Sequence, residues 1–399
     1  MSEYTSFLAH LDRIQSGKEK FIPNPHTRIG EIFNLHKGRY ILVGSNSGVG
    51  KTSMVDDSLI LKPYEWVRKE EFPINFGGLY YSMERATRDK LAKWLSWKIF
   101  QDKGVKIPSN IFSVGSQGDI KLEDKHTLLA KEYEPWMQGV LDRITIYQGP
   151  QSPDKIRKDV DKAARRLLYH IVSDDVNIFL DGVKQGEFNL NVTKETQEGK
   201  LPFRRLTIKE ETFDLFPNQS KWILKDPNTF FFILLDHLGK LKGTNKKASI
   251  DEIDEVLSVA RDDYQFSPIA ISQFNRAIGE FGRIKFANGD LSPTLDDFKD
   301  SGNPSESADL ILSIFDPYRY KSYDNQGVYK GYSIASGPCT LTPSGIQRFR
   351  SFHVLKNSYG PSQITYGMRF TGEVMDFKLL PLPNSPDMNR IYAEIAQGK

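Results

Sequence analysis

The sequence predicts an α/β protein with a mainly parallel central sheet flanked by helices, and three observations lead to this fold class. An apolar segment at 40–43 runs directly into a glycine-rich turn and then into a helical pattern. A second segment, Thr229–Asp236, has six consecutive apolar residues, as expected of a central parallel strand buried on both faces. A third, at 268–272, again ends in polar residues. Open α/β sheets place their ligands at such carboxyl ends of strands.

Composition fits a soluble globular protein, with 39% hydrophobic and 26% charged residues in a chain of 399. Because 54 basic residues stand against 51 acidic ones, any nucleic-acid site has to be a local patch. The single cysteine, Cys339, excludes an internal disulfide and fits a reducing compartment. The sequence shows no metal-ligand cluster, no leader and no apolar run near 18 residues. We therefore expect a cytoplasmic protein without a membrane partner, in the host cytoplasm if it is encoded by a phage.

The glycine-rich turn has the layout of a phosphate-binding loop. Its glycines allow backbone N–H groups to converge on an anion, and the helix that follows adds its positive dipole end. Lys51 is placed to reach the β- and γ-phosphates, and the Thr52 hydroxyl to hold Mg²⁺. The strict pattern has Gly at 45, where this chain has Ser. We expect ATP and Mg²⁺ as ligands, bound by Gly44, Ser45, Asn46, Ser47, Gly48, Val49, Gly50, Lys51, Thr52 and Ser53.

The segments that flank this loop are expected to alternate between helices and strands. Residues 3–18 form an amphipathic pattern whose apolar face packs on its own domain or on a neighbouring subunit, and both options stay open. A strand at 76–84 ends in Glu84, whose carboxylate is a candidate general base, and a helix at 88–101 follows. Further on we expect a helix at 122–142, a strand at 143–148 and a basic helix at 152–171.

A nucleotide site of this kind also needs an acidic residue at the end of a hydrophobic strand, which holds Mg²⁺ opposite the Thr52 hydroxyl. Asp181 and Asp236 are the two candidates, and Asp236 is preferred because the strand before it is the more apolar. Residues 173–227 then form a β-rich insertion, either a surface decoration or a contact for a partner or DNA. After a helix at 249–260, the strand at 268–276 ends in a polar triplet in which Gln273 could sense the γ-phosphate.

Taken in order, these segments resemble the RecA-type motor domain of DnaB-like replicative helicases of superfamily 4. The matching motifs run from about residue 21 to 377. They are Gly-Ser-Asn-Ser-Gly-Val-Gly-Lys-Thr at 44–52, Tyr-Ser-Met-Glu at 81–84, Leu-Leu-Asp-His-Leu at 234–238, Ile-Ser-Gln-Phe-Asn-Arg at 271–276, Asp-Phe-Lys-Asp-Ser-Gly at 297–302, Glu-Ser-Ala-Asp-Leu-Ile-Leu at 306–312 and Leu-Lys-Asn-Ser-Tyr-Gly-Pro at 355–361. The pair at 271–276 and 297–302 is the most specific of these.

The resemblance implies a RecA-like P-loop fold and a role for each matched residue. Glu84 stands at the position of the catalytic base, Asp236 at that of the Mg²⁺ shell and Gln273 at that of the γ-phosphate sensor, with Lys51 and Lys356 completing the catalytic set. The DNA-binding set comprises Arg276, Lys299, Asp300, Ser301 and Gly302. In such a ring these loops grip the backbone of single-stranded DNA, independently of sequence.

Three departures from the family pattern bear on function. His237 and Gly239 stand where the family usually has Tyr and Gln. We expect a compact form without the family's large N-terminal domain, with a linker helix at 1–20, a motor domain at 21–380 and a tail at 381–399 that is helical from about residue 387. The family's trans-acting pair is a Lys and an Arg two residues later, and here the pair is Lys356 and Ser358. Lys356 acts alone, or one of Arg348, Arg350 and Arg369 substitutes, or hydrolysis is weak.

The sequence thus predicts an ATP-hydrolysing replicative DNA helicase, a homo-oligomer expected to form a hexameric ring on single-stranded or forked DNA. A primase or a helicase loader is an expected partner. Two alternatives remain. One is a RecA-like ATPase that binds single-stranded DNA without unwinding it, as a recombinase or mediator does, and the other is a regulatory or scaffolding ATPase with weak hydrolysis.

Overall fold

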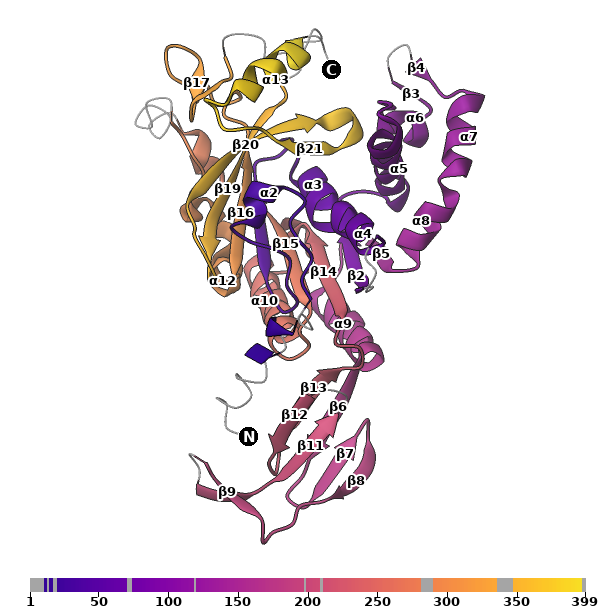
Figure 1. The fold of residues 1–399 in the computed structure, drawn as a ribbon, viewed down its shortest axis with the longest axis vertical. Helices are drawn as coiled ribbons and strands as arrows, with labels where there is room; N and C mark the ends of the chain where they lie inside the picture. Colours follow the sequence, from indigo (N-terminus) through magenta and orange to yellow (C-terminus); the bar gives the residue numbers. More distant parts are fainter. Residues whose placement is uncertain are drawn as a thin grey trace.

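The fold is organised around one large sheet, from which a smaller β-rich lobe projects (Figure 1). The computed structural model describes residues 11–12, 14–16, 20–69, 74–117, 120–196, 199–208, 211–280, 290–335 and 347–396. Six strands of the large sheet are mutually parallel, in the spatial order β16 (Leu310–Phe315), β1 (Ile41–Ser45), β15 (Ser267–Gln273), β14 (Thr229–Asp236), β2 (Asn75–Ser82) and β5 (Ile144–Gln148). Beyond β16 three antiparallel strands extend the sheet, β19 (Phe349–Asn357), β20 (Ile364–Thr371) and β21 (Asp376–Leu379).

Helices cover both faces of this sheet. One face packs against the continuous helical segment α3 (Lys51–Met54), η1 (Val55–Leu61, π-helical) and α4 (Lys62–Val67), and against α5 (Thr87–Lys103) and α8 (Glu134–Leu141). The other packs against α9 (Pro153–Leu167) and α10 (Lys246–Asp262). The centre of strand β14 is apolar because its side chains enter the cores on both faces of the sheet. Phe232 and Leu234 enter the first core, whereas Phe231, Ile233 and Leu235 enter the second.

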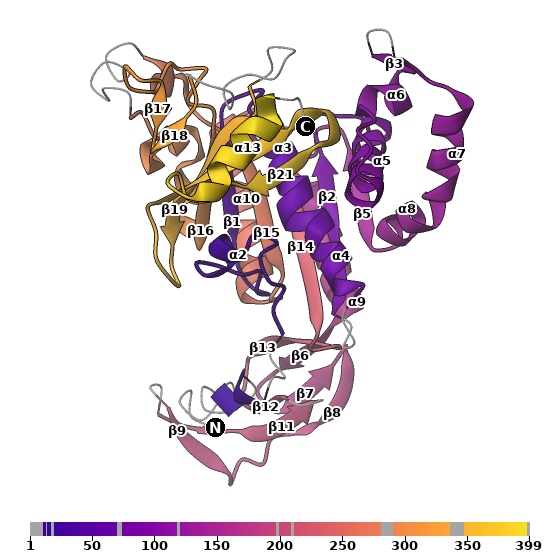
Figure 2. The ribbon, with the colours of Figure 1, turned by 45° about the horizontal axis from the view of Figure 1, so that its top comes forward.

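The projecting lobe has its own sheet and its own small core. Its four-stranded antiparallel sheet runs β13 (Ser220–Leu224), β6 (Leu168–Ser173), β7 (Asn177–Leu180) and β8 (Val183–Glu187). Two hairpins follow, β9 (Thr193–Thr196) with β10 (Gly199–Pro202), and β11 (Arg204–Ile208) with β12 (Glu211–Leu215). The lobe core comprises Ile171, Ile178, Phe188, Phe213, Leu215 and Ile223. The lobe hangs below the amino ends of the parallel strands, away from β20 and β21 (Figures 1 and 2).

The predicted helix at 152–171 is wrong at its carboxyl end. Helix α9 stops at Leu167, and residues 168–173 form β6 instead. They do so because β6 pairs with β13 over its length, from Leu168 opposite Leu224 to Val172 opposite Ser220. Pairing with a strand about fifty residues away overrides the local helical pattern, as strand formation often depends on tertiary context.

The remaining elements are short. The segment predicted as one helix at 122–142 is two helices, α7 (Asp124–Glu132) and α8, because the chain turns at Tyr133. Of the predicted linker helix, 11–12 and 14–15 are helical, with Leu11 and Ile14 exposed, and residues 3–10 lie outside the described part. The others are α2 (Thr27–Gly30), α6 (Ser109–Ser113), β3 (Ser116–Gln117), β4 (Ile120–Lys121), η2 (Leu238–Lys240), η3 (Arg276–Gly279), η4 (Leu295–Ser301), α12 (Gly302–Ser307), β17 (Val328–Tyr329), β18 (Tyr332–Ser333), η5 (Gly372–Val374) and α13 (Pro386–Ala396).

The predicted fold class is confirmed. The described residues contain the mainly parallel sheet, the flanking helices and the additional antiparallel strands. The tail helix α13 is more than a surface helix, because Met388 is buried in a cluster with Tyr332, Phe349 and Leu380. A search of the helices in the described ranges finds none with both the length and the apolar character needed to cross a bilayer.

Candidate functional site

The glycine-rich loop leaves the carboxyl end of β1 and turns into α3, as the sequence predicts. Strand β1 is buried along its whole length, so the position of the loop is fixed by the core of the sheet. Gly48 and Gly50 have φ angles of 78° and 108°, in the left-handed region that favours glycine. Gly50 is also the N-cap of α3, whose first residue is Lys51. The loop therefore has the backbone geometry in which N–H groups can converge on an anion.

Packing explains why the glycine of the loop stands at 44 and not at 45. A Cβ atom on Gly44 would collide with the rings of Phe298 and Phe274, which meet edge to face with centroids 5.1 Å apart. Ser45 is fully buried, and its hydroxyl donates to the carbonyl of Asn46 over 3.0 Å. Gly44 thus serves the contact between β1 and the segment carrying Phe298.

Three of the predicted side chains converge after the loop. The Thr52 hydroxyl donates a hydrogen bond to Asp236 Oδ1 over 3.0 Å, across the gap between α3 and the end of β14. Lys51 is buried, with 8% of its surface exposed. Burial lowers the pKa of Lys51, and the nearby carboxylates of Asp236 and Glu84 act in the opposite direction. Lys51, Thr52 and Asp236 therefore lie in one site, with the cation largely desolvated.

The two strands that flank β14 add Glu84, after the end of β2, and Gln273, at the end of β15. Glu84 follows β2 and has half of its side chain exposed, as a group that must reach a ligand should. Gln273 ends β15, is exposed, and pairs in register with Ser45 at the entrance to the loop. Both therefore lie at the same edge of the sheet as Lys51.

His237 is a site residue that the sequence did not identify. Its Nδ1 accepts a hydrogen bond from the Gly239 amide over 3.1 Å, and its Nε2 lies 3.9 Å from Glu84 Oε2. Burial lowers the pKa of His237, and the Lys51 ammonium acts in the same direction, so the ring is neutral near pH 7. Since Nδ1 accepts, the ring proton belongs on Nε2, facing Glu84. Its position directly after Asp236 was the only signal in the sequence.

Two arginines support the outside of the loop, a role that no local pattern of the sequence indicates. Arg350 Nε donates to the carbonyl of Val49 over 3.0 Å, and its NH1 lies 3.3 Å from Asp316 Oδ2. Arg319 NH1 donates to the carbonyl of Ser47 over 2.7 Å. Loop carbonyls that are bound from outside leave the loop amides to face inward.

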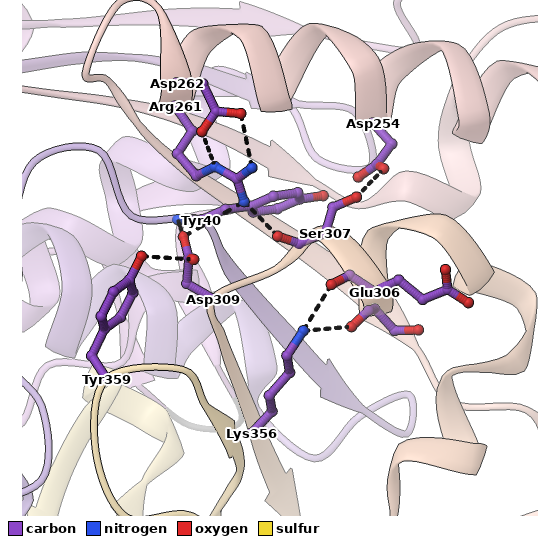
Figure 3. Close-up of polar contacts among 10 residues, drawn as sticks. Tyr40, Asp254, Arg261, Asp262, Glu306, Ser307, Asp309, Lys356 and Tyr359 are labelled. Carbon is purple, nitrogen blue, oxygen red and sulfur yellow. Dashed lines mark hydrogen bonds and ion pairs between the residues drawn. The ribbon is translucent and has the colours of Figure 1, made fainter. Parts of the chain in front are cut away.

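Lys356 lies at the other end of the sheet. It pairs with Ile311 near the start of β16, and its ammonium donates to the carbonyls of Glu306 over 2.7 Å and Ser305 over 3.4 Å (Figure 3). The Ser358 amide donates to the carbonyl of Asp309 over 2.9 Å. The hydroxyl of the next residue, Tyr359, donates to Asp309 Oδ1 over 3.3 Å (Figure 3).

The three arginines considered as substitutes for the missing finger are engaged within their own chain. Arg348 makes two hydrogen bonds of 2.7 Å to Glu373, and Arg369 lies 3.5 Å from Glu394. Arg350 is held at Val49 and Asp316. All three are largely or partly buried, and none points freely toward solvent in this chain.

The predicted DNA-binding residues fall in η3, η4 and the start of α12. Arg276 begins η3, Lys299, Asp300 and Ser301 end η4, and Gly302 begins α12, but their side chains lie outside the described part of the structure. The described residues beside them are packed firmly: the Asn275 amide donates to the carbonyl of Asp297 over 3.0 Å. Through Phe298 on Gly44, η4 lies directly against the strand that leads into the phosphate loop.

The oxygen ligands at Thr52 and Asp236 fit Mg²⁺. This ion is usually held by one or two carboxylates, with substrate phosphates and water supplying the remaining ligands. Among the residues that the structure describes, no group of three or more His, Cys, Asp or Glu side chains is suited to a metal. The hydroxyl and the carboxylate are already joined by their 3.0 Å hydrogen bond.

The chain is similar to known proteins in one segment of its sequence and in its fold. No protein-family model matches the chain. The replicative DNA helicase DnaB of Buchnera aphidicola subsp. Acyrthosiphon pisum (strain APS) is 27% identical over 118 residues, which is 29% of this chain and 24% of that helicase. The match thus spans about a quarter of the curated relative.

Two solved structures share the fold. An ATPase domain matches 95% of this chain and 99% of its own length, with a TM-score of 0.58 and 14% identity. A DnaB-like replicative helicase, studied with its interactions with primase, matches 90% of this chain and 63% of its own length, with a TM-score of 0.55 and 14% identity. The chain therefore has the fold of these ATPase and helicase domains, and a segment of 118 residues is similar in sequence to part of a replicative DNA helicase.

Proposed function

We propose that this protein is an ATP-dependent replicative DNA helicase that assembles as a ring, translocates on single-stranded DNA and unwinds the duplex at a fork. The observation that carries the proposal is the division of the catalytic set between the two ends of the sheet. Lys51, Thr52, Glu84 and Asp236 gather at the carboxyl ends of the parallel strands, whereas Lys356 stands at the amino ends. A complete site needs a second subunit, which is the arrangement that a ring of identical chains supplies.

Each residue at the carboxyl end has a role that follows from its position. Lys51 binds the β- and γ-phosphates inside the glycine-rich loop, and Thr52 and Asp236 hold Mg²⁺, which neutralises phosphate charge. Glu84 accepts the proton of the attacking water, and the Nε2–H of His237 orients its carboxylate. Gln273 reports the presence of the γ-phosphate to η3 and η4, because β15 leads directly into η3 and the Asn275 amide that follows it donates to the carbonyl of Asp297 in η4.

The DNA contact is proposed for η3, η4 and the start of α12. Arg276, Lys299, Asp300, Ser301 and Gly302 lie in these elements, and backbone contacts would make movement independent of sequence. Since Phe298 packs on Gly44, a shift of η4 on DNA is coupled to the strand that carries the phosphate loop. The protein would act in the compartment that holds this DNA, with a primase or a loader as partner.

The decisive experiment is strand displacement on a forked DNA with a free 5′ tail. We expect ATP-dependent unwinding by the full chain and none by Lys51→Ala, which removes the phosphate-binding ammonium. If the wild-type protein binds ATP and single-stranded DNA but leaves the fork closed, the helicase proposal fails for the isolated protein.

A second function has support from one observation. Ser358 replaces the expected finger arginine, and Arg348, Arg350 and Arg369 are all held inside the chain. A RecA-type ATPase that binds nucleotide tightly but turns it over slowly would follow. Tight ATP binding with negligible turnover supports a regulatory or scaffolding role, whereas strand exchange without unwinding supports a recombinase or mediator.

A further inference from the structure

A buried ion cluster lies directly behind Asp236. Lys90, in the first turn of α5, has no exposed surface. Its ammonium donates to Asp56 Oδ2 over 2.9 Å, lies 3.8 Å from Asp236 Oδ2, and also contacts the Tyr80 hydroxyl. The Tyr80 hydroxyl in turn donates to Asp56 Oδ1 over 2.8 Å. One cation thus connects the helix after the phosphate loop, the strand before Glu84 and the end of β14.

The two oxygens of Asp236 have different partners. Oδ1 accepts the Thr52 hydroxyl at 3.0 Å, and Oδ2 faces the Lys90 ammonium at 3.8 Å. With its side chain only 3% exposed, the carboxylate is held from both sides, with little solvent to compete. Rotation of the carboxylate would break one of these contacts, so the pair of neighbours fixes the orientation in which Asp236 meets Thr52.

A lysine in this place needs an explanation, because an ammonium in a protein core costs several kcal/mol unless it is paired and hydrogen-bonded. Trp94, one turn further along α5, is fully buried and packs edge-on against Tyr80, so a pair of aliphatic side chains would fill positions 56 and 90 at lower cost. What an apolar pair cannot do is hold a carboxylate.

We propose that Lys90 is a positioning residue for Asp236, fixing Oδ2 so that Oδ1 and the Thr52 hydroxyl stay together as a ready pair of Mg²⁺ ligands. The inference rests on the proposed nucleotide site and adds to it a residue that touches neither nucleotide nor metal. Partners behind a metal ligand commonly change metal affinity by about 10- to 100-fold.

The chain offers a matched control one residue away. Asp57, next to Asp56 on η1, is also fully buried and forms an ion pair of 2.8 Å with Lys62. Asp57 further accepts the Trp97 indole N–H over 2.8 Å. This second pair faces Asp376, 3.9 Å from Lys62, and has no contact with Asp236. Lys62→Met and Lys90→Met therefore each leave one buried carboxylate of η1 unpaired, and only Lys90→Met affects the metal ligand.

The test is equilibrium binding of a fluorescent ADP analogue to the full chain as Mg²⁺ is titrated, with parallel binding in EDTA. For Lys90→Met we expect the Mg²⁺ concentration at half effect to rise about tenfold, with binding in EDTA unchanged. Lys62→Met should lose stability and keep the wild-type Mg²⁺ dependence. If Lys90→Met does not fold, the double variant Asp56→Leu/Lys90→Leu removes both charges and should show the same rise.

Three results decide the question. A wild-type Mg²⁺ dependence in Lys90→Met or in the double variant overturns the inference. So does tighter Mg²⁺ binding, which is the result expected if the ammonium acts only by repelling the metal ion. A wild-type chain that binds no nucleotide at all overturns the proposed function itself, and this is seen before any variant is compared.

Discussion

Lys356 and Lys51 lie at opposite ends of the central sheet of one chain. Lys356 pairs with Ile311 near the start of β16, and β16 runs parallel to β1 with Leu310 opposite Ile41. Lys51 follows the far end of β1, beyond Ser45. At about 3.3 Å per strand residue, the length of β1 separates them. Lys356 therefore cannot act on the nucleotide of its own chain, and any role in hydrolysis requires a neighbouring subunit.

The first prediction is complementation between two inactive variants. Lys51→Ala destroys a phosphate loop and keeps Lys356, whereas Lys356→Ala does the reverse. In a random equal mixture about one interface in four joins an intact loop to an intact Lys356, so a similar share of the ATPase activity should return. The measurement is DNA-stimulated ATP hydrolysis of each variant alone and of the mixture.

A mixture of wild-type protein with Lys51→Ala, at equal total concentration, serves as the control for subunit exchange. Recovery in the mixture of the two single variants places Lys356 in a shared site. If that mixture stays as inactive as its components while the control shows exchange, Lys356 is not a trans-acting residue.

The second prediction concerns Gly44. Because a methyl group there collides with Phe298 and Phe274, Gly44→Ala should destabilise the protein by about 1–3 kcal/mol, as overpacking of a core does. The variant should also bind nucleotide more weakly, since β1 leads into the loop. Chemical denaturation and binding of a fluorescent ADP analogue measure the two effects. A smaller side chain in Gly44→Ala/Phe298→Leu should recover part of the loss, and strictly additive costs would show that the two positions do not touch.

Much of this site could be predicted because its parts are local in sequence. The glycine-rich loop, Thr52 and the strand that ends in Asp236 are contiguous patterns of strand, turn and helix, and strand order brings them to one edge. Gly44 could not be understood in the same way. Glycine is required at 44 because the ring of Phe298 packs against it. Phe298 is more than 250 residues further along the chain, so no local pattern contains this contact.

The residues that sequence reasoning missed share a cause. In the sequence, Lys90 is indistinguishable from the other charged residues of a helix. Only the packing of α5 against η1 makes it a buried partner of Asp56. Arg319 reaches the loop from the segment that follows β16, and Arg350 reaches it from the start of β19. The boundary between α9 and β6 likewise depends on β13. Long-range contacts determine each of these features.

The third prediction is a loss of stability in mild acid. Burial lowers the pKa of His353 from its usual value of 6.5 to about 3, and it does the same for His26, where Lys62 adds to the effect. Below pH 6.5 the unfolded chain takes up protons at these two residues that the folded chain does not, so the free energy of unfolding falls as the pH drops toward 3. Each histidine contributes a slope of up to about 1.4 kcal/mol per pH unit.

Asp57 opposes this trend, because burial raises its pKa to about 6 and the folded chain then gains stability between pH 6 and the usual carboxyl range. The contribution of one histidine is isolated by comparing wild type with His353→Gln, which retains a polar group near Ser351 and Thr365. Denaturation at pH 7.5 and pH 5 should show a shallower decrease for the variant. Equal decreases would mean that His353 is protonated in the folded chain.

The last prediction is that the projecting lobe can be removed. Its two ends meet, since the Lys225 amide donates to the Leu167 carbonyl over 2.9 Å and β6 pairs with β13 from there outward. His170 stands opposite Trp222, and the two rings stack with centroids 3.9 Å apart. Replacing 172–220 with Asn-Gly should close a two-residue hairpin between Ile171 and Lys221, the next pair along the ladder, which has the same hydrogen-bonded register as Leu167 and Lys225. This dipeptide favours the type I′ turn that such hairpins use.

The shortened chain should fold and bind nucleotide with wild-type affinity, because the lobe buries its own apolar residues and the part retained keeps Leu168 and Leu224 in the main core. Circular dichroism, thermal melting and binding of a fluorescent ADP analogue measure this outcome. Loss of nucleotide binding in a folded variant would contradict it and assign the lobe to the site. If binding survives but strand displacement on the fork is lost, the lobe acts on DNA or on a partner, which separates its role from that of a surface decoration.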